Sequence, residues 1–222
     1  RPPRSTLFPY TTLFRSPYVE KGQEVICFAI ASGMSSSMNV MRLAAEELNA
    51  ENLVTVIDSA NLSTGIGLLV IEAAVMAQQG KSAAEIASYI ETLKPLVRAS
   101  FVVDTLTYLY RGGRCSGLAA LAGGALKLHP RISVEDGKMG PGKKYRGNME
   151  KVVLSYVKDM EEAMKNARPE RVFITHSGSA PEIVDKVRAY LNDLHVFYEI
   201  LETRAGGVVS SHCGPGTLGV LF

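Results

Sequence analysis

The 222-residue sequence lacks several features that mark common kinds of site. Its three cysteines, at positions 27, 115 and 213, include no Cys-x-x-Cys pair, which argues against a disulfide framework or a zinc site and favours a reducing compartment. The four histidines show no spacing typical of metal ligands, so no metal is expected. No apolar run reaches the length of a transmembrane helix. A net charge of +2 gives no bulk electrostatic argument for nucleic acid.

The composition is that of an ordinary globular protein, with 46% hydrophobic and 21% charged residues. The length allows one large domain or two small ones. Residues 1–16, RPPRSTLFPYTTLFRS, contain two near-copies of a short phrase and resemble translated sequencing-adapter DNA. We expect them to be a non-native tail, with the native protein beginning upstream; a disordered tail is the alternative.

The stretch Glu24 to Leu48 predicts a strand, a turn and a helix. EVICFAI reads as a buried strand, and MNVMRLAAEEL reads as a helix that buries Val40, Leu43, Ala44 and Leu48. Four serines lie between them, in Ser32 to Ser37. A helix start exposes free N–H groups and the positive end of a helix dipole, so this turn is a candidate anion site. The serines can equally serve only as helix caps.

Alternating strands and helices continue through the first half. Strands are expected at 53–58 and 100–104, a small-residue turn at 59–67, and helices at 68–79 and 82–96, with Ser82 and Glu85 forming a capping box. Apolar strands in this order predict a parallel α/β sheet. Gly65 and Gly67 lack the third glycine of a dinucleotide fingerprint, so a nucleotide-binding module is a weak alternative.

The second half predicts a more mixed sheet. A short helix is expected from Thr105, small-residue and long helices at 118–126 and 149–166, a hairpin turn at Asp136-Gly137, strands at 171–175, 195–202 and 220–222, and a helix at 180–191 opened by Pro181. We place a partial parallel domain at 17–113, with its first strand missing, and a second α/β domain at 114–222.

Two further segments carry side chains suited to an anion. Gly112-Gly113-Arg114 suggests a guanidinium aimed into a cleft, since arginine suits carboxylate or phosphate; a helix cap followed by a surface arginine is the alternative. Ala205 to Leu218, AGGVVSSHCGPGTL, predicts a stiff turn in which His212 donates to an anion or acts as acid or base. His176 ends another strand and is a secondary candidate.

These segments together resemble the DegV family. The residues that carry the resemblance are Ile30 to Ser36, Val56 to Ser59 with Gly65 and Gly67, Thr105 to Arg114, His176 to Gly178, and Gly206 to Gly219. The resemblance implies two α/β domains, a parallel Rossmann-like one and one with a mixed sheet, with a fatty acid bound between them. It implies a bacterial, cytoplasmic protein without catalysis of its own, the fatty-acid-binding subunit of a fatty-acid kinase, which presents the carboxylate to a separate ATP-using subunit.

Mapped by motif, the resemblance gives roles to individual residues. The carboxylate is expected at Ser35, Ser36, Arg114 and His212, with Ser32, Ser211, Gly214 and His176 as secondary candidates. Arg146 is expected to serve kinase docking. No catalytic residue, metal or cofactor is implied besides the bound fatty acid. Ser36 and Ser37 replace the usual Gly-Thr, which reduces backbone freedom in the turn.

The residues also leave a hydrolase open. A serine/histidine hydrolase acting on an acyl ester can be assembled from Ser35, His212 and either Asp58 or Asp104. The nucleophile elbow Gly-x-Ser-x-Gly is incomplete, however, because Ser37 stands at the place of its second glycine.

Overall fold

The computed structural model describes residues 17–114 and 128–222, and its contacts divide the chain into two compact units. Unit 1 runs to Leu62 and continues over Ile66–Pro95. Unit 2 contains Ser63–Gly65 and Leu96–Phe222. The predicted domain boundary lies after residue 113, whereas by its contacts the segment 96–113 groups with unit 2.

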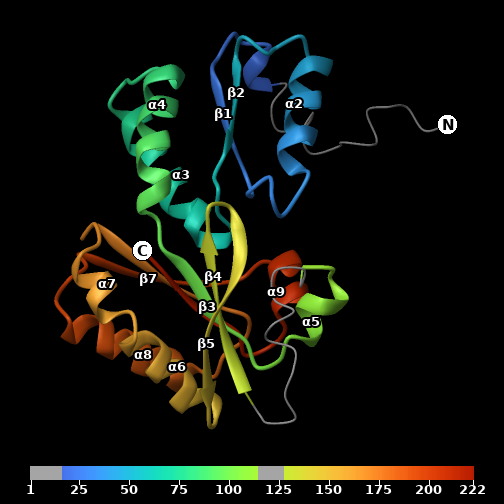
Figure 1. Ribbon diagram of the computed structural model, residues 1–222. Helices are drawn as coiled ribbons and strands as arrows, with labels where there is room; N and C mark the ends of the chain where they lie inside the picture. The colour runs from blue at the N-terminus through green and yellow to red at the C-terminus, as the bar shows by residue number, and fades with distance from the viewer. Residues whose placement is uncertain (1–16, 115–127) are drawn as a thin grey trace. The chain divides into compact units, whose positions relative to one another are not determined.

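Unit 1 contains a two-stranded parallel sheet with helices packed on it (Figure 1). The strands β1 and β2 pair from Val25 opposite Val54 to Ala29 opposite Asp58, which confirms the predicted parallel strands. The helices α2 and α4 contact this sheet. The elements are β1 (Val25–Ala29), α2 (Ser37–Glu47), β2 (Val54–Asp58), α3 (Ser63–Gln78), α4 (Ala83–Leu93) and the short 3-10 helix η2 (Lys94–Leu96), of which residues 63–65 and 96 group with unit 2.

The helices of unit 1 confirm one prediction and correct two. Ser82 and Glu85 form the predicted capping box at the start of α4. The helix α3 begins at Ser63, so Gly65 and Gly67 lie inside a helix and not in a turn. Leu43, predicted to be buried by α2, is 49% exposed, and Ala44 and Ala45 make the buried face of that helix.

Unit 2 is built on a six-stranded mixed sheet with the order β5-β4-β3-β8-β6-β7. Its strands are β3 (Ala99–Val102), β4 (Leu128–Glu135), β5 (Lys138–Arg146), β6 (Arg171–His176), β7 (Glu199–Arg204) and β8 (Leu218–Leu221). Among the described strands of this sheet, only β6 and β7 pair in parallel; β3 runs antiparallel to both β4 and β8. The prediction that β3 extends the parallel sheet is therefore wrong. A short buried strand has the same apolar pattern in either kind of sheet, so pattern alone did not decide its partners.

The helices of unit 2 are α5 (Thr107–Arg111), α6 (Met149–Lys158), α7 (Glu161–Lys165), α8 (Pro181–Asp193) and α9 (Gly207–Cys213). Residues of α6, α7 and α8 form the main core cluster of this unit together with residues of the sheet. The helices α6 and α8 pack on each other and on the strands (Figure 1). Tyr156, fully buried, donates to the Ser100 carbonyl at 2.7 Å and accepts from the Val220 N–H at 3.0 Å. The buried Tyr156 hydroxyl thus has its hydrogen-bond partners and links α6 to the middle of the sheet.

Four predictions for unit 2 can be compared directly with the structure. The Asp136-Gly137 hairpin and Pro181 at the start of α8 are confirmed. The single helix expected over 149–166 is two helices, α6 and α7. The segment predicted as a stiff turn contains the helix α9, and the expected helix at 118–126 lies outside the described residues. The fold is α/β with a small parallel sheet and a larger mixed sheet, as predicted.

Candidate functional site

The serine-rich turn of unit 1 is held by backbone hydrogen bonds at its base. The N–H groups of Met34 and Ser35 both donate to the carbonyl of Ala31, at 2.8 and 3.1 Å. The Ala31 N–H in turn donates to the carbonyl of Asn61 at 2.9 Å, which ties the turn to the loop after β2. Ser32 and Ser36 are exposed within this fixed frame, and Ser35 is partly buried.

The start of α2 has the N–H groups that an anion needs. Ser35 Oγ accepts from the Ser37 N–H at 3.2 Å, whereas Ser36, at the N-cap position, makes no side-chain cap bond. Within the described residues, the N–H groups of Met38 and Asn39 donate no hydrogen bond. Free N–H groups in the first helical turn attract negative charge. The turn therefore has the donors that the predicted anion site requires, with Ser35 as the helix-capping serine.

Asp58 fixes the position of the turn through hydrogen bonds from backbone N–H groups. Its Oδ2 accepts from the Ser32 N–H at 3.2 Å, and its Oδ1 accepts from the Ala60 N–H at 2.9 Å. Partial burial raises the pKa of this carboxyl, but the hydrogen bonds from Ser32 and Ala60 and the charge of Lys94 outweigh it and leave the pKa below its usual value. Asp58 is thus ionised at neutral pH and acts as a scaffold for the turn.

Lys94 is a neighbour of this turn that sequence reasoning missed. Its ammonium donates to the backbone carbonyl of Asp58 at 3.0 Å and pairs with Glu91 at 2.6 Å. Its side chain is only 17% exposed. No local pattern marks a lysine in a helix end as a partner of a strand 36 positions earlier, so only the three-dimensional fold could reveal it.

In unit 2, two of the predicted motifs meet where α5 packs on α9. The imidazole of His212 lies against Gly112, at a place where a Cβ on Gly112 would collide with the ring. The ring of Tyr108 lies in the same way against Gly214. The structure therefore brings the Gly-Gly-Arg motif and the His-Cys-Gly-Pro-Gly motif together within one unit.

Arg114 follows this contact but folds back on its own helix. Its Nη1 donates to the carbonyl of Gly112 at 2.7 Å, and its N–H donates to the carbonyl of Leu109 at 2.9 Å. The side chain is exposed, so the guanidinium keeps donors for a further partner. Gly113 adopts a φ of +68°, which ends α5 and turns the chain towards Arg114.

The secondary candidates in unit 2 are engaged in the fold. The Ser211 hydroxyl donates to the carbonyl of Val208 at 2.8 Å. His176 is 6% exposed; its Nδ1 accepts from the Ser179 N–H at 3.2 Å, so its Nε2 carries the proton and donates to Glu202, at 3.2 Å. That bond lowers the pKa of the Glu202 carboxyl. His176 therefore orders the turn after β6.

Cys213 is not a nucleophile in this arrangement. Burial raises the pKa of its thiol to about 11. A thiol with that pKa is protonated at neutral pH, and only the thiolate attacks or binds a metal. Within the described residues, no three His, Cys, Asp or Glu side chains are grouped as a metal site would require.

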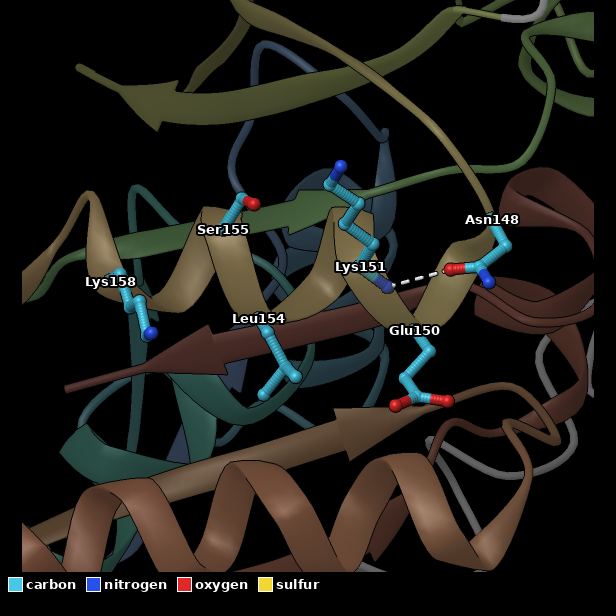
Figure 2. A pocket seen from close by; sticks show the side chains of 6 residues that line it. All are labelled: Asn148, Glu150, Lys151, Leu154, Ser155 and Lys158. Carbon is cyan, nitrogen blue, oxygen red and sulfur yellow. Dashed lines mark hydrogen bonds between the residues drawn. The ribbon is translucent and has the colours of Figure 1, made fainter.

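Beyond these clusters, α6 carries a surface hollow of about 390 Å³. Figure 2 shows its lining residues along this one helix, with the Asn148 side chain accepting from the Lys151 N–H at 2.9 Å. The lining is Asn148, Glu150, Lys151, Leu154, Ser155 and Lys158. It shares no residue with the predicted carboxylate contacts. Arg146, the predicted docking residue, is exposed at the end of β5.

The structure thus groups the predicted site residues in two places. Ser32, Ser35 and Ser36 share the turn of unit 1, and the remaining carboxylate-binding candidates lie in unit 2 around α5, α9 and the end of β6. Across residues 17–114 and 128–222, no helix is long and apolar enough to cross a membrane.

The known proteins that resemble this chain in sequence or in structure include several DegV proteins. A DegV domain-containing protein of Deinococcus radiodurans is 32% identical over 97% of this chain and 76% of its own length. A solved DegV family protein of Thermus thermophilus, described by its fatty acid binding, has a TM-score of 0.85 and 28% identity over 96% of this chain and 74% of that chain. The fatty acid kinase B3 protein of Streptococcus pneumoniae, loaded with linoleic acid, has a TM-score of 0.81 and 20% identity over 96% of this chain and 74% of its own.

The family model covers almost the whole sequence. The model for DegV, described as an uncharacterised protein family, matches residues 6–222. The match includes residues 6–16 of the predicted non-native tail, and that tail lies outside the described residues. The chain belongs to the DegV family.

Proposed function

We propose that this chain binds a long-chain fatty acid and presents its carboxylate to a separate kinase subunit that uses ATP to make the acyl phosphate. The observation that carries the binding half is the TM-score of 0.85, at 28% identity, to the Thermus thermophilus protein described by its fatty acid binding. A second solved relative, at 27% identity and a TM-score of 0.79, is described as a stearic acid-binding protein of Eubacterium ventriosum.

In unit 1 the proposed carboxylate contacts are Ser35 and Ser36, with Ser32 as a secondary contact. A carboxylate accepts hydrogen bonds only, so it suits a turn that offers hydroxyl groups and the N–H groups of Met38 and Asn39. Charge-assisted bonds of this kind are about twice as strong as neutral ones. Asp58 accepts from the Ser32 and Ala60 N–H groups and so keeps the frame of the turn fixed when a ligand arrives.

In unit 2 the proposed contacts are Arg114 and His212. Arg114 keeps free donors beside its bond to Gly112. Ser211, Gly214 and His176 remain secondary candidates. Because the Ser211 hydroxyl and both His176 ring nitrogens already have protein partners, we give these two residues supporting roles around the site.

The acyl chain supplies most of the binding free energy in this proposal. Each methylene removed from water contributes about 0.8 kcal/mol, so a long chain contributes on the order of 10 kcal/mol before ordering costs. The polar groups then fix the direction in which the chain enters.

The kinase half rests on the resemblance in the Ser turn and in the Gly206 to Gly219 motif. The Streptococcus pneumoniae protein carries the name of a fatty acid kinase component, and at 20% identity its likeness concerns the fold. In this proposal the chain has no catalysis and no cofactor of its own, Arg146 contacts the kinase, and the need for ATP places the protein in the cytoplasm.

The hydrolase alternative gains no support from the described residues. In a serine hydrolase an acid orients the histidine through the nitrogen that does not face the serine. The Nδ1 of His212 is buried against Gly112 without a hydrogen-bond partner among the described residues. Asp58 is bound to backbone N–H groups, and Asp104 lies beside His129, at 3.3 Å from its Nδ1.

Binding is tested with oleate as the probe, by native mass spectrometry and calorimetric titration of the 222-residue chain. We expect one bound oleate, and about tenfold weaker binding in Ser35→Ala, Arg114→Gln and His212→Gln. Ser88→Ala, on an exposed position of α4, and Arg111→Gln, an exposed arginine of α5, serve as matched controls. A wild-type chain that takes up no oleate contradicts the function; equal affinity in all the variants contradicts only the assigned contacts.

The kinase step is tested by trapping acyl phosphate with hydroxylamine in the presence of ATP and the candidate kinase subunit. We expect Arg146→Ala to reduce product while oleate affinity stays unchanged. Lys138→Ala, at the opposite end of β5, is the control. Product formation by the chain and ATP without the kinase subunit would contradict the division of labour.

A further inference from the structure

The helices α5 and α9 interlock through two reciprocal contacts between a ring and a glycine. The imidazole of His212, on α9, fills the space beside Gly112 at the end of α5, and a Cβ at Gly112 would fall well inside van der Waals contact with Nδ1. The phenol of Tyr108, on α5, fills the space beside Gly214 at the end of α9, and a Cβ there would collide with three ring atoms. Each helix thus contributes one ring and one glycine.

This packing decides which nitrogen of His212 can meet a ligand. Its Nδ1 is buried and has no hydrogen-bond partner among the described residues. The nearby N–H groups of Gly112, Gly113 and Arg114 all donate to carbonyls of α5. Nε2 is therefore the ring nitrogen left for a ligand, and it must carry the proton if that ligand is an anion.

The second contact fixes the end of the helix that carries His212. Gly214 has a φ of +81°, its N–H donates to the carbonyl of Ser210 at 2.8 Å, and its carbonyl accepts from the Ser177 hydroxyl. The Tyr108 ring occupies the side of Gly214 where a Cβ would lie. A shift of that ring would let the last turn of α9 move, and His212 lies in that turn.

We propose that Tyr108 is a positioning residue that aims Nε2 of His212 at the anionic ligand, by packing its ring on Gly214 while Gly112 receives the imidazole. The assignment rests on the proposed function in that the anion is a fatty-acid carboxylate. Tyr108 acts through shape: its hydroxyl makes no hydrogen bond to any of the described residues, so the ring and not the hydroxyl carries the role.

The experiment combines two readouts on the full chain. The first is the ¹⁵N chemical shifts of the His212 ring, assigned with His212→Gln, which report the protonated nitrogen and its surroundings without a ligand. The second is oleate affinity by titration calorimetry. Tyr108→Phe keeps the ring and should match the wild type in both. Tyr108→Leu should shift the His212 ring signals and weaken oleate binding about tenfold.

A matched pair of glycine variants separates contact from backbone strain. Gly112→Ala introduces the collision at an ordinary φ and should behave like Tyr108→Leu. Gly113→Ala introduces strain at φ +68° but meets no atom within 4 Å, so it should leave the ring signals unchanged. Circular dichroism checks that each variant folds. If Gly112→Ala does not fold, Tyr108→Leu alone decides the outcome.

The outcomes separate this proposal from the proposed function. Unmoved His212 signals in Tyr108→Leu overturn the positioning role, as does a shifted ring with unchanged oleate affinity. A wild-type chain that binds no oleate contradicts the proposed function, while the ring signals still show whether Tyr108 holds His212.

Discussion

The turn of unit 1 and the α5–α9 pair of unit 2 are both proposed to contact the carboxylate, but they are held in different ways. In the turn, the positions of Ser32 and Ser37 are set by hydrogen bonds to Asp58 and Ser35. In the pair, His212 is set by the fit of a ring against Gly112. Hydrogen bonds between polar groups fix the side-chain positions in the turn, whereas close packing fixes them in the α5–α9 pair.

The difference predicts which changes each place can tolerate. A hydrogen-bonded turn should respond to the loss of an acceptor and to pH, because its frame depends on an ionised carboxylate. A packed pair should respond to a single added methyl group, because close-packed groups have no room for it.

Gly214→Ala should be the most damaging single change in this set. It adds a Cβ that meets the Tyr108 ring, at a φ of +81° that L residues avoid. We expect a loss of about 2–5 kcal/mol in the free energy of unfolding, measured by urea titration, from strain and overpacking together.

Gly216→Ala is the control for that variant. Its φ is +72°, yet nothing lies within 4 Å of the added Cβ. It should therefore cost only the strain, about 1–2 kcal/mol. Equal losses in the two variants would show that the Tyr108 contact contributes nothing to stability.

Asp58→Asn tests the hydrogen-bonded turn. The folded-state pKa of Asp58 lies below the ordinary value of 3.8, so its stabilising contribution is present above that value and is lost as the pH falls through the folded-state pKa. We expect the variant to be about 1 kcal/mol less stable than the wild type at pH 7, with the gap closing below about pH 4.

The measurement is the urea midpoint of both chains between pH 7 and pH 3. Asp185→Asn, which removes an exposed carboxylate of α8, is the control and should follow the wild type closely. A gap for Asp58→Asn that stays constant over this range would mean that the charge of Asp58 does not support the turn.

Substitution of the two serines at the start of α2 should give the smallest changes in stability. Ser35→Ala removes the acceptor of the Ser37 N–H and should cost about 0.5–1 kcal/mol. Ser37→Ala removes a buried hydroxyl that has no hydrogen-bond partner among the described residues, so it should be neutral or slightly stabilising in thermal unfolding. The reverse order would indicate that Ser37, and not Ser35, organises the helix start.

Local signals in the sequence predicted the elements that local chemistry determines. The Ser82–Glu85 capping box, the Asp136-Gly137 turn and Pro181 at the start of α8 involve residues close together in the chain, and all three are present. Each depends on backbone groups that lie within a few positions.

The failures came from glycine and from distant partners. Gly65 lies inside α3 and Gly207 is the first residue of α9, although glycine has a low helix propensity and the sequence pattern predicted turns there. The partners of β3 and the contact of Lys94 with Asp58 depend on residues far away in sequence, which no local pattern encodes.

The candidate site was predictable as a list of residues but not as an arrangement. Motifs named His212 and Gly112 separately, and the ring-on-glycine contact that joins them requires the fold. The same is true of His176, whose hydrogen bonds to Ser179 and Glu202 give it a structural role that its motif does not reveal.

The position of β8 has a consequence for how the protein forms. Residues 218–221 lie in the middle of the six-stranded sheet, between β3 and β6, and all four are buried. During synthesis, β3 emerges early but has its central neighbour only after more than a hundred further residues have been added. Pairings so distant in sequence form slowly. The nascent mixed sheet should therefore expose unpaired strand edges that attract chaperones until its last strand arrives.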